Sequence, residues 1–393
     1  MPPTLVSSTK FRQFWGTSIK KHYLWITLVA ILLGTSIYAF RYSLFTGVML
    51  EIQAHLDDPI ADLDSESLGP AANIKGAPPE FALANLSNLN SPDLDSWIQR
   101  SQTQVLLVQQ KGVIIHEYYA YGTQKGTELN GFSMAKSIVA LLIGIAIDDG
   151  RIDSENDSIV RYLPEIVLKD GDQVSLKDML QQVSGMRDRL VDVRTTLAGQ
   201  SLEDDLSEVT FGSDKSFAYS NINYHLLSLV LQRVYSKPLN EIFEEKLWQA
   251  LNLEQAAIVN STGYCCLFAS ARTWLALGEL FLHQGQYQGR QIVSADWIHK
   301  MINEKQAPIL FMVQATSKSQ GNQYGYHIYS GLDDFPEYYW MEGMGLQLVM
   351  INPSTETIIV RLGDVPSILE IDSTRRDKNL VDGLLKAVEY KGQ

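Results

Sequence analysis

The stretch that decides the fold is Gly131–Gly150, which reads GFSMAKSIVALLIGIAIDDG. Within it, Met134–Asp149 is apolar on nearly every face, and Gly150 follows as the kind of residue that commonly ends a helix. A helix that is apolar all round must be buried by the rest of its domain. We therefore expect residues 134–149 to form the central helix of a sizeable core.

Strand-like runs lie on either side of this helix along the chain, and turn residues separate them. Residues 151–300 between them look mostly helical, with polar loops. This order predicts an α/β domain whose sheet is assembled from both ends of the folded region, with a helical subdomain inserted between them. The expected strands are Gln104–Gln110, Val113–Tyr121, Leu346–Ile351 and Thr357–Leu362, and the expected outer helices are Pro92–Arg100 and Asp377–Tyr390.

The amino terminus differs from the rest of the chain. Residues 23–40 carry no charge, and as a helix their 18 residues would be roughly 27 Å long, close to the thickness of bilayer hydrocarbon. Four basic residues precede this run and only Arg41 follows it directly, so the positive-inside rule places residues 1–22 in the cytoplasm. We expect a single-pass anchor in the cell (inner) membrane with a periplasmic or extracellular catalytic domain. A cleaved signal peptide and a buried core helix are the alternatives.

The region after this run is acidic and interrupted by prolines. Residues 41–80 therefore predict a stalk, and the folded domain is expected over residues 81–393.

Composition excludes several classes of protein. The 393 residues are 45% hydrophobic and carry a net charge of −13, which disfavours a protein that tracks nucleic-acid phosphates. The two cysteines, Cys265 and Cys266, are neighbours and cannot form an ordinary long-loop disulfide, so we interpret them as buried thiols. The seven histidines show no metal-binding spacing, and no phosphate-binding glycine loop is present. We expect no metal and no cofactor, and a small molecule or peptide-like substrate as the partner.

The first turn of the central helix carries a nucleophile and a base within reach of each other. Ser133 and Lys136 are three residues apart, which puts their side chains on one face of a helix. A serine hydroxyl needs a nearby base, and a lysine amine can act as that base only if burial or a neighbouring cation lowers its pKa. The helix N-terminus adds backbone N–H groups that favour an anionic oxygen near Ser133. The spacing therefore indicates a candidate site for acyl transfer.

The sequence leaves two other interpretations of Ser133 open. The S-x-x-K spacing is common, since the chain has a second copy at Ser7–Lys10, and a serine before an apolar helix is usually its N-cap. Gly131–Ala135 also approximates the nucleophile elbow G-x-S-x-G. An elbow needs a preceding strand, however, and Gly122–Asn130 is predicted to be a polar loop.

A second polar element, Tyr219–Asn221, precedes a helix predicted at Leu226–Val234. A tyrosine can act as a general base or acid when an ammonium stabilises its phenolate, and an asparagine such as Asn221 can hold a substrate carbonyl. The alternative is a loop tyrosine packed beside a helix cap. Nearby, His225 is interpreted as a packed core histidine, and the acidic pair Asp204–Asp205 as solvated.

Taken in order, these motifs resemble the serine β-lactamase-like hydrolases, which include class C β-lactamases, D-alanyl-D-alanine peptidases and related esterases. The resemblance spans about residues 100–365 and is longest to the 6-aminohexanoate-oligomer hydrolase group. It is carried by GFSMAKSIVALLIGIAIDDGRI, VSLKDMLQQVSG, FAYSNINYHLLSLVLQRV, GYCCLFASARTWLALGELFLHQGQYQG and VMINPSTETIIVRLG. It implies an α/β fold in which N- and C-terminal helices flank an antiparallel sheet, with an inserted all-α subdomain.

The resemblance also implies roles for the site residues. Ser133 would be the acyl-forming nucleophile, Lys136 its proton-transfer partner and Tyr219 the base that takes the serine proton. Asn221 would orient the substrate. Gly343 and Met344 would lie at the substrate on an edge strand, with the Met344 N–H as the second oxyanion donor.

The third family element is where this chain departs from the pattern. The family has Lys-Thr-Gly or His-x-Gly there, whereas this chain has Met341–Gly343 with Glu342 at the centre. Glu342 would repel the carboxylate of a β-lactam or a D-Ala-D-Ala peptide. We therefore expect a serine hydrolase that cleaves an uncharged or cationic amide or ester. The alternatives are β-lactamase or D-Ala-D-Ala peptidase activity, and a catalytically idle binding module of the same fold.

Overall fold

The structure of the protein is a computed structural model, and the residues it describes all belong to the compact unit Pro59–Gln393. The described residues are 71–76, 92–169, 173–186, 206–207, 209–259, 262–305, 323–332, 334–363 and 378–389. The predicted basic tail, the predicted anchor at 23–40, the first part of the predicted stalk and the pair Asp204–Asp205 lie outside them. Within the described ranges, no helix has the length and apolar character needed to cross a membrane.

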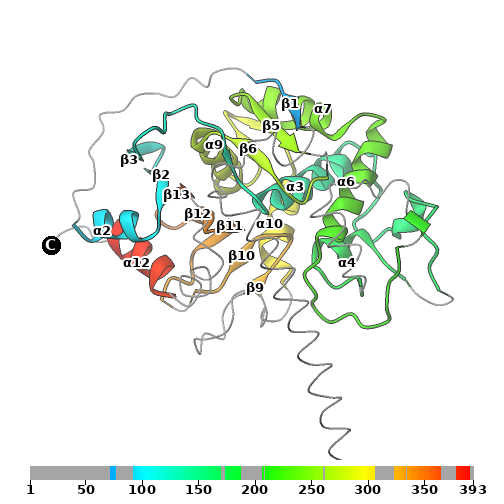
Figure 1. The fold of residues 1–393 in the computed structure, drawn as a ribbon. Helices are drawn as coiled ribbons and strands as arrows, with labels where there is room; N and C mark the ends of the chain where they lie inside the picture. Colours follow the sequence, from blue (N-terminus) through cyan, green and yellow to red (C-terminus); the bar gives the residue numbers. More distant parts are fainter. Residues whose placement is uncertain are drawn as a thin grey trace, which may run out of the picture. The chain divides into compact units, whose positions relative to one another are not determined.

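A seven-stranded antiparallel sheet forms the centre of the domain, in the order β3-β2-β13-β12-β11-β10-β9 (Figure 1). The early strand β2 pairs with the late strand β13, so both ends of the folded region contribute to one sheet, as predicted. Lys111 and Gly112 have φ values of +52° and +74°, which fits the tight hairpin turn predicted between β2 and β3. The strands are β2 Thr103–Gln110, β3 Val113–Tyr119, β9 Gln323–Tyr324, β10 Tyr329–Ser330, β11 Tyr339–Gly343, β12 Gln347–Asn352 and β13 Thr357–Gly363.

Helices cover both faces of this sheet. The side chains of β13 alternate: Ile358 and Val360 belong to the larger core with helices α3 and α9, whereas Ile359 belongs to a second core with α2 and α12. Residues 134–146 of α3 are all buried, which confirms the central helix. The four covering helices are α2 Pro92–Arg100, α3 Met134–Asp148, α9 Ala271–Leu282 and α12 Lys378–Glu389.

The inserted region is not wholly helical, and here the prediction was wrong. Three of its strands form a second, four-stranded sheet with β1, in the order β1-β5-β6-β4. Strand β1 (Ala71–Ile74) pairs with β5, so this end of the predicted stalk is part of the fold. The inserted strands are β4 Leu129–Asn130, β5 Ala256–Val259 and β6 Leu267–Ala269, with a small hairpin of β7 Gln286–Tyr287 and β8 Arg290–Gln291. The inserted helices are η2 Ile159–Arg161, α4 Leu176–Leu180, α6 Asn221–Tyr235, α7 Leu239–Phe243, η4 Glu244–Trp248, α8 Gln249–Leu251 and α10 Ala295–Asn303.

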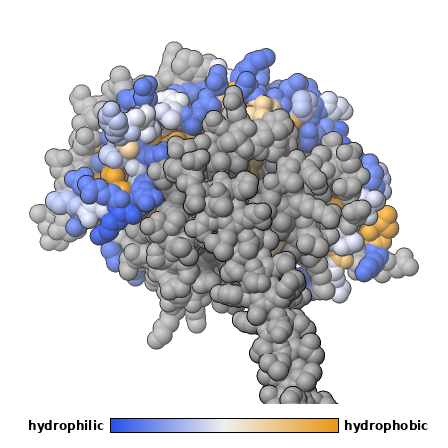
Figure 2. All heavy atoms as spheres, in the orientation of Figure 1, coloured by the Kyte–Doolittle hydropathy of each residue, from blue (hydrophilic) through white to orange (hydrophobic). Residues whose placement is uncertain are grey.

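The described surface that is visible in Figure 2 is mainly hydrophilic, with small, separate hydrophobic areas. The large hydrophobic side chains exposed in the described part of the chain are Val113, Tyr121, Val167 and Met344. Met344 is one of the predicted site residues, and it directly follows strand β11.

Candidate active site

Ser133 lies at the start of α3, directly after a turn with unusual backbone geometry. Phe132 has a φ of +46°, a left-handed conformation that is uncommon for a bulky residue, and its N–H donates to Asn130 Oδ1 at 2.8 Å. Ser133 occupies the N-cap position, but its side chain makes no capping hydrogen bond. Ser133 thus has the position that the cap interpretation expects, but its hydroxyl is engaged elsewhere.

The segment before Ser133 also differs from the prediction. Leu129 and Asn130 form strand β4, which pairs with β6, so the loop predicted for residues 122–130 ends in a short strand. The strand–turn–helix path resembles a nucleophile elbow more than the sequence indicated. Gly131 is required in this turn because a Cβ there would lie 2.3 Å from the Trp274 ring of α9.

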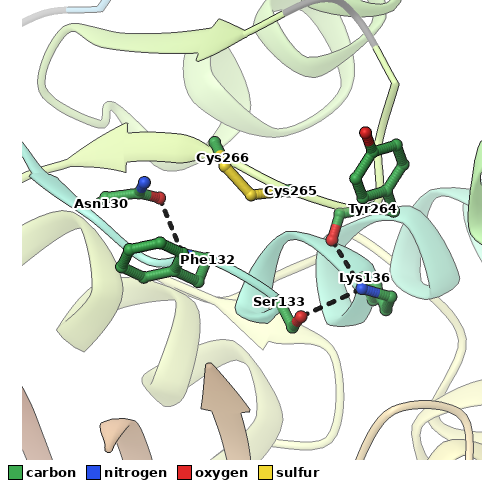
Figure 3. Close-up of a disulfide and its surroundings, with 7 residues drawn as sticks. All are labelled: Asn130, Phe132, Ser133, Lys136, Tyr264, Cys265 and Cys266. Carbon is green, nitrogen blue, oxygen red and sulfur yellow. Dashed lines mark hydrogen bonds between the residues drawn. A yellow bond between two sulfur atoms is a disulfide. The ribbon is translucent and has the colours of Figure 1, made fainter. Parts of the chain in front are cut away.

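Lys136 is completely buried, and its amine points at Ser133. Lys136 Nζ donates to Ser133 Oγ at 3.0 Å and to the main-chain carbonyl of Tyr264 at 2.7 Å (Figure 3). The three-residue spacing explains the first contact, and the second comes from a segment 128 residues further along the chain. The structure thus brings the predicted nucleophile and its predicted proton partner into hydrogen-bond contact.

Tyr219 completes the cluster from a third part of the chain. Lys136 Nζ lies 5.0 Å from the centroid of the Tyr219 ring, and Tyr219 Oη lies 3.5 Å from Nε2 of His327. The helix that follows Tyr219 begins at Asn221, five residues before the predicted start, because Ser220 caps it: Ser220 Oγ accepts from Ile222 N at 3.2 Å. A hydroxyl, an amine and a phenol therefore converge at one place.

Gln182, which the sequence analysis did not identify, holds the tyrosine segment in position. This fully buried side chain accepts from Ser220 N at 3.0 Å and donates to Ser220 O at 3.1 Å, and the main-chain carbonyl of Gln182 accepts from Ala218 N at 2.8 Å. Gln182 also accepts from Asn223, which is fully buried in the first turn of α6. Asn221 itself is half-buried at the start of that helix, and its role toward the substrate stays a prediction.

The third element meets the nucleophile turn through main-chain contact. A Cβ on Gly343, the last residue of β11, would lie 2.2 Å from the carbonyl oxygen of Gly131. This close approach places Gly343 and the next residue, Met344, beside the turn that carries Ser133. The predicted pair of oxyanion donors, the N–H groups of Ser133 and Met344, thus comes from two adjacent turns, and its function stays a prediction.

A fully buried arginine fixes the β11–β12 turn, residues 344–346. Arg361 donates through Nη1 to Gly345 O at 2.5 Å and to Leu346 O at 3.1 Å, and through Nε to Thr103 Oγ1 at 3.0 Å. It also donates to the carbonyl of Ser101. These contacts tie the turn to the junction of α2 and β2.

Gln347 adds a second set of bonds to the same turn. Its Nε2 donates to Met344 O at 3.2 Å and to Gly363 O at 2.7 Å, and its Oε1 accepts from Gly363 N at 2.9 Å. Gly345 and Leu346 have φ values of +76° and +62°, so the turn has a conformation that needs such support.

Glu342 is the middle residue of Met341–Gly343, the element in which this chain departs from the family pattern. Its side chain is half-buried, and Oε2 accepts from the indole Nε1 of Trp340 at 3.0 Å. The carboxylate therefore lies one residue before Gly343 on strand β11, and the indole fixes its orientation.

The cysteines and His225 pack around the lysine's carbonyl partner. Cys265 and Cys266 directly follow Tyr264 and form a vicinal disulfide, so the expectation of two free thiols was wrong (Figure 3). The centroid of the His225 ring lies 5.9 Å from that of Tyr264. Burial lowers the pKa of His225 to about 4, which fits a packed, neutral histidine. Among the described residues, no group of His, Cys, Asp and Glu side chains could hold a metal ion.

The fold and this cluster define a class of protein. A serine at the start of a buried helix, a lysine one turn on and a tyrosine against that lysine form a side-chain set that suits a serine hydrolase. The β-lactamase family model matches residues 95–364. The chain therefore belongs to the β-lactamase family of serine hydrolases, which confirms the resemblance drawn from its motifs.

Individual relatives agree with this assignment. The chain is 24% identical to the 6-aminohexanoate-dimer hydrolase of Paenarthrobacter ureafaciens over an alignment of 320 residues that covers 75% of this chain and 80% of that protein. A Bacillus anthracis structure assigned as a 6-aminohexanoate-dimer hydrolase superposes with a TM-score of 0.65 at 17% identity, covering 86% of this chain and 97% of that one. A class C β-lactamase from Rhodobacter sphaeroides gives a TM-score of 0.56 at 16% identity, covering 76% and 100%. The Bacillus and Rhodobacter structures therefore share the fold of this chain.

Proposed function

We propose that this protein is a membrane-anchored serine hydrolase that cleaves an amide or ester bond through a Ser133 acyl-enzyme. The observation that carries the proposal is that Ser133 and Tyr219 both lie against the buried amine of Lys136. A structural serine would cap α3, and this hydroxyl accepts from the lysine instead.

The geometry supports a two-step reaction. Ser133 Oγ attacks the substrate carbonyl carbon while its proton passes to the Lys136–Tyr219 pair, and the oxyanion that forms accepts hydrogen bonds from the N–H groups of Ser133 and Met344. Collapse of this intermediate breaks the bond to the leaving amine or alcohol, which takes the proton from the pair. Water then attacks the acyl-enzyme and releases the acid.

The substrate class follows from Glu342. Glu342 directly precedes Gly343, and Met341 stands where the family pattern has its lysine or histidine. The element therefore carries a carboxylate and lacks the cation, which disfavours a substrate carboxylate and favours an uncharged or cationic group. The Paenarthrobacter relative is a hydrolase of 6-aminohexanoate dimer. We therefore expect linear amides or esters to be turned over in preference to β-lactams.

The chain offers a matched control for the nucleophile assignment. Ser133→Ala should abolish both turnover and labelling by a fluorophosphonate, whereas Ser7→Ala, in the second S-x-x-K copy, should leave both unchanged. Intact-mass measurement should show about one acyl group per chain during turnover of an activated ester. Retained labelling of Ser133→Ala would reject the assignment.

A substrate panel distinguishes the rival activities. Full-length protein is assayed with p-nitrophenyl esters, linear amides, D-amino-acid peptides and a chromogenic cephalosporin. Preferred turnover of the cephalosporin or of D-Ala-D-Ala peptides would show that Glu342 does not govern specificity, and would support the β-lactamase or peptidase alternative. A labelled serine without turnover of any class would support an idle binding module.

The anchor is part of the proposal and is supported by the sequence of residues 23–40 and its flanking charges. We expect the catalytic domain on the periplasmic or extracellular side. Alkaline phosphatase fused after residue 60 should be active, and the same enzyme fused after residue 20 should be inactive. The reverse pattern would overturn the orientation.

A further inference from the structure

His327 lies in the connection between β9 and β10, where it is completely buried. Four tyrosine rings surround its imidazole, with centroids 6.3 Å (Tyr219), 5.8 Å (Tyr224), 5.8 Å (Tyr324) and 5.5 Å (Tyr329) away. A polar ring in such a place needs hydrogen-bond partners for its nitrogens, because water does not reach it. The partners of its two nitrogens are Ser137 and Tyr219.

Ser137 determines which ring nitrogen carries the proton. Ser137 Oγ lies 2.9 Å from Nδ1 of His327 and 2.8 Å from the main-chain carbonyl oxygen of the same residue. The carbonyl can only accept, so the single hydroxyl proton goes to it, and Nδ1–H then donates to Ser137 Oγ. Nε2 is left with a lone pair, and it faces Tyr219 Oη at 3.5 Å.

The charge state of the ring agrees with this assignment. Burial, reinforced by the positive charge of Lys136, lowers the pKa of His327 well below its ordinary value. The imidazole therefore stays neutral beside the lysine. A neutral ring with a lone pair on Nε2 is a hydrogen-bond acceptor toward Tyr219.

We propose that His327 is a positioning residue for acyl transfer, whose Nε2 accepts the hydrogen of the Tyr219 hydroxyl and thereby directs a phenol lone pair toward Lys136. The inference rests on the proposed function. The Ser133 proton passes to the Lys136 amine in its neutral form and from there to the leaving group, while the Tyr219 hydroxyl keeps the hydrogen that it donates to Nε2 and His327 keeps its Nδ1 proton throughout. One face of α3 then carries the nucleophile (133), the amine (136) and the residue that fixes the tautomer (137).

A double-mutant cycle on the full-length protein tests this coupling. His327→Phe should lower kcat about 10- to 100-fold with KM within about twofold, because one hydrogen bond that orients a reacting group is lost. In the Tyr219→Phe background the same change should cost less than about threefold. Losses that simply multiply would show that His327 acts independently of the Tyr219 hydroxyl, and would overturn the proposal.

Ser137→Ala provides a second variant that keeps the helix intact, because alanine is a strong helix former. It should lower kcat about 3- to 10-fold in the wild-type background and have no effect beside Tyr219→Phe. The matched control is Ser228→Ala, which removes an equally buried hydroxyl that donates to His225 O and Thr262 O, and should leave kcat unchanged. Equal effects of Ser137→Ala and Ser228→Ala would overturn the proposal. Failure of Ser133 labelling in the wild-type protein would instead reject the proposed function.

Discussion

The first turn of α3 and the β11–β12 turn supply the two halves of the candidate site in different ways. In the first turn of α3, a three-residue spacing brings Ser133 and Lys136 together, so the helix itself creates the pair. In the β11–β12 turn, the main chain is the functional group, and side chains from elsewhere give it its shape, chiefly Arg361 and Gln347. Local helix geometry brings the reactive side chains together, whereas long-range contacts position the predicted oxyanion donor, the Met344 N–H.

This difference predicts opposite responses to the loss of a buried cation. Lys136 provides a reacting amine, whereas Arg361 donates hydrogen bonds to a framework of carbonyl and hydroxyl oxygens. Replacing each with methionine, which has a similar length and no charge, separates chemistry from support.

The largest effect is expected for Lys136→Met, which breaks the α3 half of the site. The rate of acylation should fall about 10³- to 10⁴-fold because the serine loses its proton partner. The free energy of unfolding should change by less than about 1 kcal/mol, because an apolar side chain replaces a buried amine. Burst kinetics and urea unfolding measure the two quantities. Lys10→Met, in the second S-x-x-K copy, is the control, and a rate within tenfold of wild type would contradict the assignment.

Gly343→Ala should have the next largest effect, because it separates the two halves. The added Cβ would lie 2.2 Å from Gly131 O. The main chain fixes the position of a Cβ, and the oxygen is itself a main-chain atom, so neither can move independently of its turn. We expect kcat/KM to fall about 10²- to 10³-fold as the predicted oxyanion donors move apart. Gly126→Ala is the matched control, since a Cβ there has no described neighbour within 4 Å. Similar activities for the two variants would show that the contact does not set the donor geometry.

Arg361→Met should lower stability more and activity less than Lys136→Met does. The free energy of unfolding should fall by about 3 kcal/mol or more, because several buried acceptors lose their donor. The value of kcat should fall about 10- to 100-fold, because the turn before β12 is no longer fixed. Arg361→Lys should recover part of the stability and little of the activity, since an ammonium cannot reproduce the planar fork. Unchanged stability of Arg361→Met would show that the turn is held by Gln347 alone.

The same contrast explains what could be predicted from the sequence. The pair Ser133 and Lys136 could be predicted, because the three-residue spacing and the apolar helix suffice to place both side chains. Tyr219 and Met344 could be proposed only through the family motifs, since nothing local brings them to Ser133. Arg361 did leave a signal: it is a charged residue within the otherwise apolar run of β13.

Gln182, His327 and β1 could not be predicted because their partners are distant in the sequence. Gln182 bonds to residues 38 and 41 positions away, and His327 to residues 108 and 190 positions away. Strand β1 lies in an acidic, proline-rich region, and what makes it a strand is pairing with β5 rather than its own composition. Main-chain pairing and side-chain bonds of this range have no periodicity to detect.

Acid stability provides the finest test of the comparison, because the α3 half has a titrating group, His327, beside its cation. Burial lowers the pKa of His225 to about 4 and that of His327 well below its usual value, whereas unfolded histidines titrate near pH 6.5. The unfolded state therefore binds more protons, and the free energy of unfolding should fall as the pH drops from 6.5 toward 4, by up to about 3 kcal/mol for His225 alone.

The charge of Lys136 contributes to the depressed pKa of His327, so removing it should let the folded protein bind that proton more readily. Urea unfolding between pH 7 and 4.5 should show a loss of stability in Lys136→Met that is smaller than in wild type by about 1 kcal/mol. In Arg361→Lys the loss should match wild type, because Lys136 keeps its charge and Arg361 is not among the causes of the lowered pKa of His327. Equal losses in all three proteins would mean that His327 does not sense the lysine charge. The amine and the imidazole would then be neighbours in space without electrostatic coupling, and burial alone would account for the pH dependence.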